Sequence, residues 1–587
     1  MISESRVSES RVSGYNKYTK YIVPAALAGL LLFGFYLRSY HIDYPSVGYH
    51  NMKENQHLSE TLNFYLHGLS IHREVFFQAG DKVPPYYEEY PQLPLIPYTG
   101  YALWKIFGIS FWTMRLQIIC YSLGTILAAF FLVRRLTGDA LMALLTAAVM
   151  TVLPINVFYG RNIQPESQCL LFLMLFFIAF LKWKETYRPR HAAAAGMMLA
   201  LTALTKTTFL VPALSVLAVF PYSRAIEDLK ARNFKPYVGF ATVLLFPLYL
   251  LITRATNVHE TLTSGFFFKM DPRPVFSWAY WKDNYGMFKN FFIDNYSGFL
   301  GFMLCYGLIT LPFTKSDARK FFIAYAATFA LLYMPVFNLF LSQHNYYQMP
   351  YVLLSAFCVA NGMDMILSNL TKEFWGRYLR LGSFIVLALA MGGVVAGINR
   401  QFDTQFFGMD AAGEYILKRT APTERFMHMA SAQYQGVCFF ARRFCAPVPE
   451  NPSDLKKFER RFGSRFIYIK AAMLGDLTKY PSWKYVSENY RVVQAGGIMT
   501  PQGFSLTHLI LEGGSAPGVI GGSAPGVGGG SASDVMGGGA ASGVNGGSAP
   551  GVGSAKFSMD DIANAKPIPA KEYEFTGGNL IFYVKEP

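Results

Sequence analysis

Long stretches of apolar residues dominate this sequence, among them 21–37, 140–158 and 321–341. Each is close to the roughly 20 residues that a helix needs to cross the hydrocarbon part of a bilayer. Charged residues make up only 15% of the 587-residue chain, whereas soluble domains usually contain roughly 25%. The composition therefore excludes a single water-soluble core and predicts a mainly α-helical protein that crosses a membrane many times.

We expect eleven membrane-spanning helices, and we place the N-terminus in the cytoplasm. The segments that then lie inside are rich in Lys and Arg, whereas the short outer turns 160–167 and 342–346 contribute only Arg161, as the positive-inside rule predicts. The first span lacks a following small-residue cleavage site, so we expect it to remain as an anchor. The predicted spans are 21–37, 114–133, 140–158, 168–182, 191–205, 207–222, 237–254, 297–313, 320–341, 347–367 and 379–398.

This topology divides the chain into three parts. Residues 1–20 form a disordered cytoplasmic tail, and 21–399 form a transmembrane domain with two long outer loops, 38–113 and 255–296. Loops of that length are usually functional, and we expect short helices in them at the membrane surface. An odd number of spans places 400–587 outside the cytoplasm.

The C-terminal part changes to short alternating elements that predict a small α/β domain. Strand-like runs lie at 425–430, 445–448, 465–470, 506–511 and 579–584, and helical runs at 432–443 and 453–462. Between them, 513–555 is rich in Gly, Ser and Ala and repeats GGSAPGV three times. Such a segment cannot bury enough apolar surface to order itself, so we expect a flexible insert between two strands of one domain.

The charge and the cysteines exclude two classes of protein. The net charge of +15 is spread between hydrophobic spans, whereas a polynucleotide-binding protein gathers its basic residues on one face or tract, so we expect no nucleic-acid partner. The six cysteines lack the spacing of a metal site. Cys438 and Cys445 lie in the predicted outer domain, where a disulfide and two buried thiols are both consistent with the sequence.

Five ionisable residues from separate loops or span ends map to the outer face. They are Glu54, Glu89, Glu166, Lys206 and His344. Charges at membrane depth are costly and are kept mainly when they are paired or functional. Their convergence on one face favours a single site.

These residues lie within five short motifs: ENQHLSE from Glu54, YYEEYPQLPL from Tyr86, YGRNIQPES from Tyr159, LTALTKTTF from Leu201 and QHNYYQMPY from Gln343. Over residues 37–399 the order of motifs and spans resembles the GT-C glycosyltransferases of the protein O-mannosyltransferase and lipid A aminoarabinose transferase group. The first motif is similar to the family's DE-x-R-Y-A-E, which puts Glu54 on the catalytic aspartate, His57 on the arginine and Glu60 on the later glutamate. Asn55 replaces the second acid. A second register, against a W-R-Q-x-D pattern, would put Gln56 on the aspartate.

The other motifs match in the same order. Glu89 stands on the glutamate of Y-F-E-K-P-P-L-P, with Tyr90 in place of its phosphate-contacting lysine. Arg161 and Glu166 match the arginine and acid of Y-S-R-x-x-x-P-D, and Lys206 matches the lysine of G-L-A-x-L-T-K-G. The last motif, which holds His344, Tyr346 and Tyr347, is similar to H-x-Y-Y-x-L-P.

The resemblance implies a GT-C fold and an inverting transfer of one sugar from a polyprenyl phosphate to an acceptor. Glu54 is the candidate general base, and we expect dehydration to raise its pKa. Lys206, Arg161 and His344 are candidates for gripping the phosphate, Tyr346 and Tyr347 for lining the lipid groove, and His57, Glu89 and Glu166 for substrate binding. The partners are the lipid-linked sugar, a glycolipid, glycan or protein acceptor, and membrane lipids. The family pattern favours the bacterial inner membrane, with the site facing the periplasm.

Purely structural roles are the alternatives to the catalytic and binding roles of these residues. Glu54 and Glu166 can cap helices, Lys206 can extend to the interface, and the tyrosines can belong to an interfacial belt. We expect no cofactor and no catalytic metal, because DxD and helical metal-ligand pairs are absent from the sequence. The alternative functions are a transporter or flippase of lipid-linked sugars, and an inactive binding relative.

Overall fold

The computed structural model describes residues 21–70, 92–254, 271–314, 316–369, 376–431, 433–513 and 559–586. They form two compact units. The first is helical and extends to Phe406, without 76–84 but with Phe575–Gly578, and the second contains Phe407–Glu574 and Asn579–Pro587. The predicted tail 1–20, Glu89, Tyr90 and all but the first residue of the predicted insert 513–555 lie outside the described residues.

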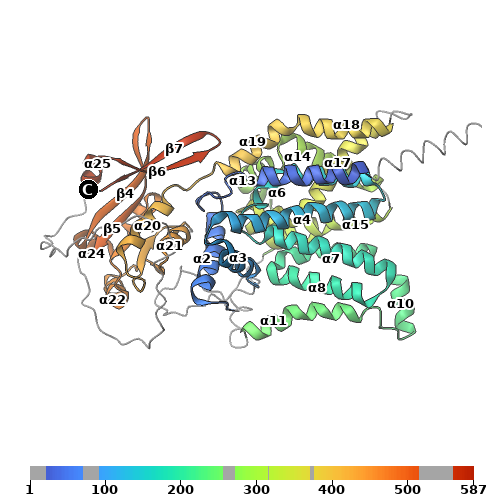
Figure 1. Cartoon of the computed structure of the whole chain (residues 1–587), viewed down its shortest axis with the longest axis horizontal. Coiled ribbons are helices and arrows are strands. Elements are labelled where there is room, and N and C mark those ends of the chain that lie inside the picture. Colours follow the sequence, from blue (N-terminus) through green and yellow to red (C-terminus); the bar gives the residue numbers. More distant parts are fainter. Residues whose placement is uncertain are drawn as a thin grey trace, which may run out of the picture. The chain divides into compact units, whose positions relative to one another are not determined.

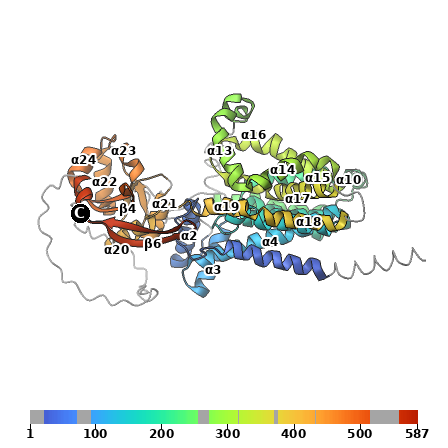
Figure 2. The same cartoon turned by 90° about the horizontal axis from the view of Figure 1, so that it is seen from above.

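Long helices run side by side through the first unit (Figures 1 and 2). The helix Tyr21–Arg38 is followed by α2 (Asn51–His67), α3 (Leu95–Phe107), α4 (Phe111–Thr137), α5 (Ala140–Val152), α6 (Pro154–Tyr159), α7 (Glu166–Thr186), α8 (Pro189–Thr205), α9 (Leu210–Ala213), α10 (Tyr222–Lys230), α11 (Leu245–Arg254), α13 (Trp278–Tyr296), α14 (Gly298–Thr310), α15 (Ser316–Thr328), α16 (Met334–Leu341), α17 (Val352–Asn369), α18 (Gly376–Leu389) and α19 (Met391–Phe402). Short 3-10 helices include η1 (Thr207–Phe209), η2 (Leu214–Val219), η3 (Val238–Leu244), η4 (Arg273–Phe276), η5 (Leu311–Phe313) and η7 (Asn345–Tyr351). The predicted outer loops thus contain α2, α3 and α13.

Among the described residues, five helices are long and apolar enough to cross a membrane, or up to eight if each bent pair is one span. The expected count of eleven is not confirmed, because several apolar stretches are broken. Pro154 begins α6 and divides the predicted span 140–158. The predicted span 207–222 is a series of short helices bent by 78° before α10, and α13 meets the next helix at 97°. The chain is an integral membrane protein with fewer straight spans than we predicted.

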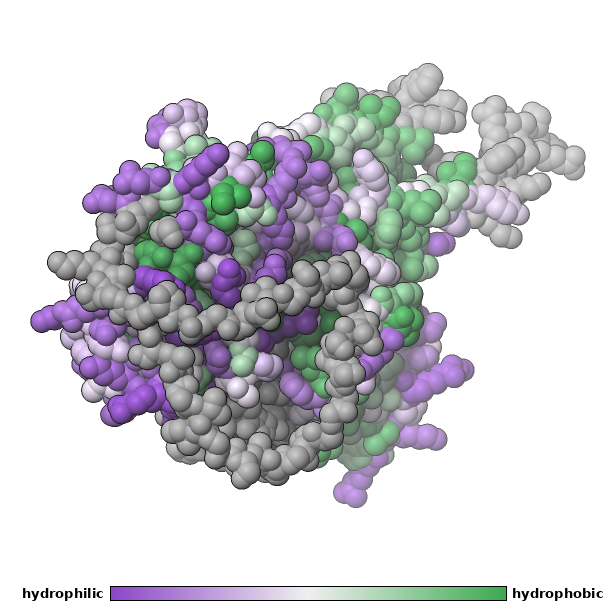
Figure 3. Space-filling view, turned by 60° about the vertical axis from the view of Figure 1, so that its left-hand side comes forward, coloured by the Kyte–Doolittle hydropathy of each residue, from purple (hydrophilic) through white to green (hydrophobic). Residues whose placement is uncertain are grey.

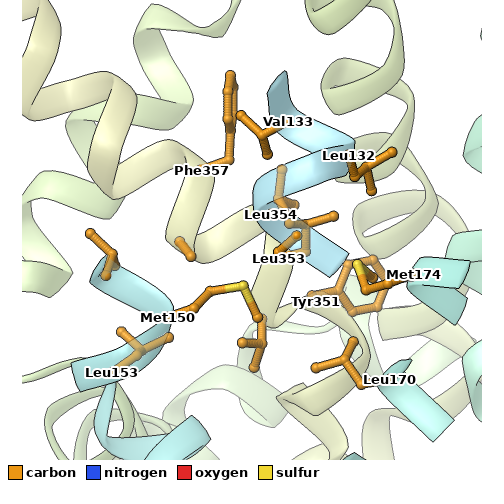
Figure 4. Close-up of a cluster of buried hydrophobic side chains, with 14 of the residues drawn as sticks. Leu132, Val133, Met150, Leu153, Leu170, Met174, Tyr351, Leu353, Leu354 and Phe357 are labelled. Atoms are coloured by element: carbon orange, nitrogen blue, oxygen red, sulfur yellow. The ribbon is translucent and has the colours of Figure 1, made fainter. Parts of the chain in front are cut away.

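The core of this unit is a continuous cluster of apolar side chains where α4, α5, α7 and α17 meet. Leu132, Met150, Leu170 and Phe357 converge there from the four helices (Figure 4). Gly307 allows α14 and α17 to approach each other closely, because an added Cβ at this position would clash with the Cys358 carbonyl group on α17. The outer faces of the helices also carry large exposed apolar side chains, and Figure 3 shows extended hydrophobic areas on one face of the molecule. Burial inside and apolar residues outside are what a bundle in lipid requires.

The second unit contains a seven-stranded sheet in the order β2-β1-β3-β5-β4-β7-β6. β1, β2 and β3 pair in parallel, and β3, β5, β4 and β7 pair antiparallel. The strands are β1 (Phe426–Met429), β2 (Cys445–Pro447), β3 (Phe466–Lys470), β4 (Tyr490–Thr500), β5 (Gly503–Gly513), β6 (Ile568–Phe575) and β7 (Gly578–Lys585), and the helices are α20 (Met409–Arg419), α21 (Tyr434–Ala441), α22 (Pro452–Phe462), α23 (Leu474–Leu477), α24 (Trp483–Asn489) and α25 (Met559–Asn564). The strand-like and helical runs of the sequence coincide with β1, β2, β3, β5, β7, α21 and α22, whereas β4 and β6 were not predicted.

Cys438 of α21 and Cys445 of β2 form a disulfide. The bond joins the helix to the edge of the sheet within the second unit. Of the two alternatives left open by the sequence, the structure has the disulfide.

Candidate active site

The polar side chains gather at one end of the first unit. They come from the segment before α2, α2 itself, the first turns of α4 and α7, the turn 160–165, the end of α8 and η7. Figure 1 shows α2 and α3 at this end of the long helices and α10 at the other. Because consecutive spans alternate in direction, chain segments that are far apart in sequence reach the same end.

Glu54 lies inside this region, with only 5% of the residue exposed. One carboxylate oxygen accepts hydrogen bonds from the Ser46 hydroxyl at 2.8 Å and from Arg115 at 3.2 Å. The other accepts from the backbone N–H of Ile163 at 3.1 Å. Three elements therefore fix the position of this carboxylate.

The pKa of Glu54 differs from our prediction. Burial by itself raises the pKa of the Glu54 carboxyl, but Arg115, Arg161 and the two hydrogen-bond donors outweigh burial and hold the pKa below its ordinary value. The predicted rise in pKa is wrong, because the sequence did not reveal that Arg115 pairs with this acid. Glu54 is thus ionised at neutral pH.

A second cluster surrounds Lys206, which follows the last residue of α8. Its ammonium pairs with the carboxylate of Glu166, the first residue of α7. The same ammonium lies 4.4 Å from the centre of the Tyr346 ring and 5.0 Å from that of Tyr347. Such cation–π contacts favour a charged ammonium in a partly dehydrated place. Lys206 is therefore a cation held between one carboxylate and two aromatic faces.

Two histidines lie beside these tyrosines. The ring centre of His344 is 5.1 Å from that of Tyr346 and 5.6 Å from that of His50. Burial lowers the pKa of His50 to about 3 and that of His344 to about 4. Both imidazoles are neutral near pH 7, so His344 can meet a phosphate as a hydrogen-bond donor and not as a cation.

Asn345 ties this cluster together. Its side-chain oxygen lies 3.2 Å from His50 Nε2 and accepts a hydrogen bond from the Tyr159 hydroxyl. Its amide donates to Asn295 Oδ1, at the end of α13, at 3.1 Å. Asn345 thereby fixes η7, which carries Tyr346 and Tyr347.

The two clusters share two elements. His50 directly precedes α2 and lies four residues, about one helical turn, before Glu54. The turn 160–165 donates from Ile163 to Glu54 and leads into Glu166, the partner of Lys206. The structure thus brings Glu54, Glu166, Lys206, His344, Tyr346 and Tyr347 to one end of the unit.

Two other predicted residues have local roles in the structure. The Arg161 guanidinium donates to the Tyr40 carbonyl group and lies 4.7 Å from the centre of the Phe402 ring. His57 Nδ1 lies 3.7 Å from Glu60 Oε2 on α2, in a buried place. Among the described residues, no contact joins Arg161 or His57 to Lys206.

Sequence reasoning missed Arg115, His50 and Asn345. Asn345 lies within the motif QHNYYQMPY, and His50 lies four residues before the motif that begins at Glu54, so their positions were a usable signal. Arg115 lies in the first turn of a predicted span, where an arginine is expected simply to reach the interface. Among the described residues, no three His, Cys, Asp or Glu side chains are grouped as metal ligands. The absence of a catalytic metal stays a prediction.

Comparison with known proteins adds a family match and several similar folds. The model of the dolichyl-phosphate-mannose-protein mannosyltransferase family matches residues 90–252. This part contains Arg115, Arg161, Glu166 and Lys206, but neither Glu54 nor His344. No curated protein sequence matches the chain.

Among solved structures, ArnT from Cupriavidus metallidurans bound to undecaprenyl phosphate is 10% identical, with 85% of this chain and 99% of that chain covered and a TM-score of 0.54. The Archaeoglobus fulgidus oligosaccharyltransferase in its apo form is 14% identical, with coverages of 84% and 75% and a TM-score of 0.51. The archaeal oligosaccharyltransferase AglB from the same organism, in complex with an inhibitory peptide and a dolichol-phosphate, is 12% identical, with coverages of 84% and 74% and a TM-score of 0.50. The family match and the shared fold confirm the resemblance to GT-C glycosyltransferases.

Proposed function

We propose that this protein is a membrane glycosyltransferase that moves one sugar from a polyprenyl phosphate to an acceptor. The observation that carries the proposal is the placement of an ionised carboxylate, Glu54, and of the Lys206 ammonium at the same end of a GT-C-like bundle. Transfer from a phosphate ester needs both a base and a cation for the leaving phosphate. The polyprenyl phosphates in the ArnT and AglB structures support this class of carrier.

Lys206 is the group that we assign to the phosphate. Its charge is balanced by Glu166 and stabilised by the faces of Tyr346 and Tyr347. A phosphate brings oxygens that accept charge-assisted hydrogen bonds from the ammonium and from the neutral imidazole of His344. Tyr346 and Tyr347 can donate hydrogen bonds to it or line the path of the lipid. Arg161 contributes positive charge to the region from its place against Tyr40.

Glu54 is the group that we assign as the base. An ionised carboxylate has about four lone-pair sites, and the three hydrogen bonds at Glu54 leave one for an acceptor hydroxyl. Arg115 makes the carboxylate a weaker base but keeps it ionised and oriented, so it acts as a positioning residue.

The reaction is then a single in-line displacement with inversion at the anomeric carbon. The acceptor oxygen forms its bond to that carbon while the bond from the carbon to the phosphate oxygen breaks. The acceptor proton passes to Glu54, and the electron pair of the broken bond remains on the phosphate, beside Lys206. The sugar is a hexose or a pentose, and the acceptor is a lipid, a glycan or a protein.

We place this site on the non-cytoplasmic face, as in a bacterial inner membrane with the site facing the periplasm. The Cys438–Cys445 disulfide supports that side for the second unit, because disulfides persist in oxidising compartments. The gathering of Lys and Arg in the segments at the other ends of the predicted spans supports it as well.

The experiment that tests the proposal is a transfer assay on the purified full chain. Radiolabelled polyprenyl-phosphate sugars are incubated with the protein and with membranes that supply acceptors, and Glu54→Gln is the control. We expect label in an acceptor with the wild type and a loss of at least about 100-fold in Glu54→Gln. Absence of transfer from every donor would contradict the proposal in favour of transport or binding.

A further inference from the structure

The helix α10 (Tyr222–Lys230) lies at the end of the first unit opposite α2 and α3 (Figure 1). It is bent by 78° from the preceding apolar segment Thr207–Val219. A helix that turns by nearly a right angle at the end of an apolar segment runs along the surface of a membrane instead of through it. This orientation puts α10 at the height of the lipid headgroups.

One side of α10 is apolar and points away from the protein. Tyr222, Ile226 and Leu229 follow one another at helical spacing, and they are 54%, 53% and 63% exposed. The polar side of α10 contacts the bundle, because Arg224 lies 3.5 Å from the centre of the Tyr187 ring at the end of α7. This arrangement is the reverse of a helix on a water-soluble domain, which buries its apolar side and exposes its polar side.

Exposed apolar residues continue along the chain beyond α10. Phe234 and Val238 are more than half exposed, as is Leu251 of α11. Val238 begins the apolar helical stretch Val238–Ile252, which contains η3 and α11. Large apolar side chains on the outside of such a stretch face lipid. The apolar side of α10 is therefore continuous in sequence with a surface that contacts lipid.

Basic residues surround this apolar side. Lys230 ends α10, and the short turn between α7 and α8 lies next to it, because Trp183 Nε1 donates to the Pro236 carbonyl group at 2.8 Å. The segments 182–190 and 222–235 together contain eight basic and three acidic residues. The exposed basic residues of the turn and of the end of α10 are Lys182, Arg188, Arg190, Lys230, Arg232 and Lys235.

Two of the three acids already have partners within the protein. Glu185 pairs with Arg135. Asp228 accepts hydrogen bonds from Asn233 at 2.8 Å and from the Tyr237 hydroxyl at 2.9 Å, which hold the chain after α10 against the helix. The surface around α10 therefore carries an excess of positive charge beside an exposed apolar stripe.

We propose that α10 and these basic residues bind anionic phospholipids of the bilayer. Tyr222, Ile226 and Leu229 insert at the boundary between headgroups and acyl chains, and the Lys and Arg side chains contact the headgroup phosphates. A zwitterionic phospholipid has the same phosphate, but its own cation opposes the excess positive charge of the protein. The inference is independent of the proposed reaction, because this surface lies at the other end of the unit from the candidate active site.

The first experiment measures the binding of phosphatidylglycerol and of phosphatidylcholine to the full chain in a neutral detergent. The wild type is compared with Lys230→Gln/Arg232→Gln/Lys235→Gln. The matched control is Lys456→Gln/Arg460→Gln/Lys484→Gln, which removes the same charge from exposed positions of the second unit.

We expect the wild type and the control to bind phosphatidylglycerol at least about tenfold more tightly than phosphatidylcholine. The variant at 230, 232 and 235 should lose at least about tenfold in affinity for phosphatidylglycerol and keep the wild-type melting temperature in detergent without lipid. Equal affinities for phosphatidylglycerol in this variant and the control would overturn the proposal.

The second experiment locates the apolar side of α10 with a nitroxide label. Ile226→Cys and Glu227→Cys are labelled separately in a Cys120→Ser/Cys305→Ser background, which removes the exposed free thiols among the described residues. In phosphatidylglycerol vesicles, the label at 226 should collide more with oxygen than with a water-soluble nickel complex, and the label at 227 should do the reverse. Equal access of the nickel complex to both labels would place the stripe in water, as a surface for a protein partner, and would overturn the proposal.

Discussion

The Lys206 ammonium lies between the Glu166 carboxylate and the ring of Tyr346, whose centre is 4.4 Å away. The exposed fractions of the two charged side chains are 12% and 2%. Two opposite charges so far from water stabilise each other, and a phosphate that enters must compete with Glu166 for the same ammonium. Removal of the Glu166 charge should therefore strengthen the binding of a phosphate at Lys206.

Glu166→Gln should destabilise the protein by about 3–5 kcal/mol, because it leaves Lys206 buried without its counter-charge. Sugar-free polyprenyl phosphate should then raise the melting temperature of the variant by more than it raises that of the wild type. The measurement is a pair of thermal melts with and without the lipid. A smaller rise in Glu166→Gln than in the wild type would show that the phosphate does not bind at Lys206.

Arg115→Met should move the acid limb of the pH–rate profile of transfer to higher pH. Arg115 opposes the effect of burial on Glu54, so the pKa of this carboxyl rises when the guanidinium is removed. Arg115→Lys keeps the positive charge and should restore most of the wild-type profile. The profile is followed with a saturating donor from pH 4 to 8, and identical acid limbs in wild type and Arg115→Met would contradict the role given to Glu54.

The protein should lose stability as the pH falls from about 6.5 towards 4. Burial lowers the pKa of His50 to about 3, below the value of about 6.5 in an unfolded chain, so the unfolded chain binds the proton first. This histidine alone should contribute about 2 kcal/mol less at pH 5 than at pH 7.5. Lys53, Lys206 and His344 surround it and oppose its protonation. His50→Asn should flatten the dependence of the melting temperature on pH. A dependence as steep in the variant as in the wild type would show that His50 does not cause the loss of stability.

Reduction of the Cys438–Cys445 disulfide should destabilise the second unit by about 2 kcal/mol, a value set by the short loop that the bond closes. Because both cysteines are fully buried, their redox state is read on denatured protein: in protein taken directly from growing cells, they should react with a maleimide only when the sample has first been reduced. Cys438→Ser/Cys445→Ser is the control for labelling of other thiols. Labelling of the two thiols without reduction would place this unit in the reducing cytoplasm.

The sequence predicted well those features that depend on local pattern. Stretches such as 320–341 and 347–367 correspond to helices that qualify as spans, because length and hydropathy alone define them. The breaks at Pro154 and before α10 were missed although a proline marks each, Pro154 and Pro221, because the spans were predicted from apolar composition, which does not change at a bend. β6 was missed because most of its residues are exposed and it lacks an apolar face.

Arg115 illustrates what sequence patterns cannot supply at the site. Glu54 and Lys206 were found by their motifs, but the pKa of Glu54 depends on a guanidinium 61 positions away in the chain. Such a pairing arises only when the folded chain brings Glu54 of α2 to Arg115 near the start of α4. For the same reason the sequence could not predict the hydrogen bonds that join Asn345 to Tyr159 and to Asn295.

The central claim is that Lys206 holds the donor phosphate and Glu54 takes the acceptor proton, and one comparison tests it most directly. Binding and transfer of a polyprenyl-phosphate sugar are measured side by side for the wild type, Lys206→Met and Glu54→Gln. We predict that Lys206→Met loses at least about tenfold in donor binding, whereas Glu54→Gln binds donor nearly as the wild type does and transfers at least about 100-fold more slowly. Wild-type rates of transfer in Glu54→Gln, or wild-type donor binding in Lys206→Met, would contradict the account.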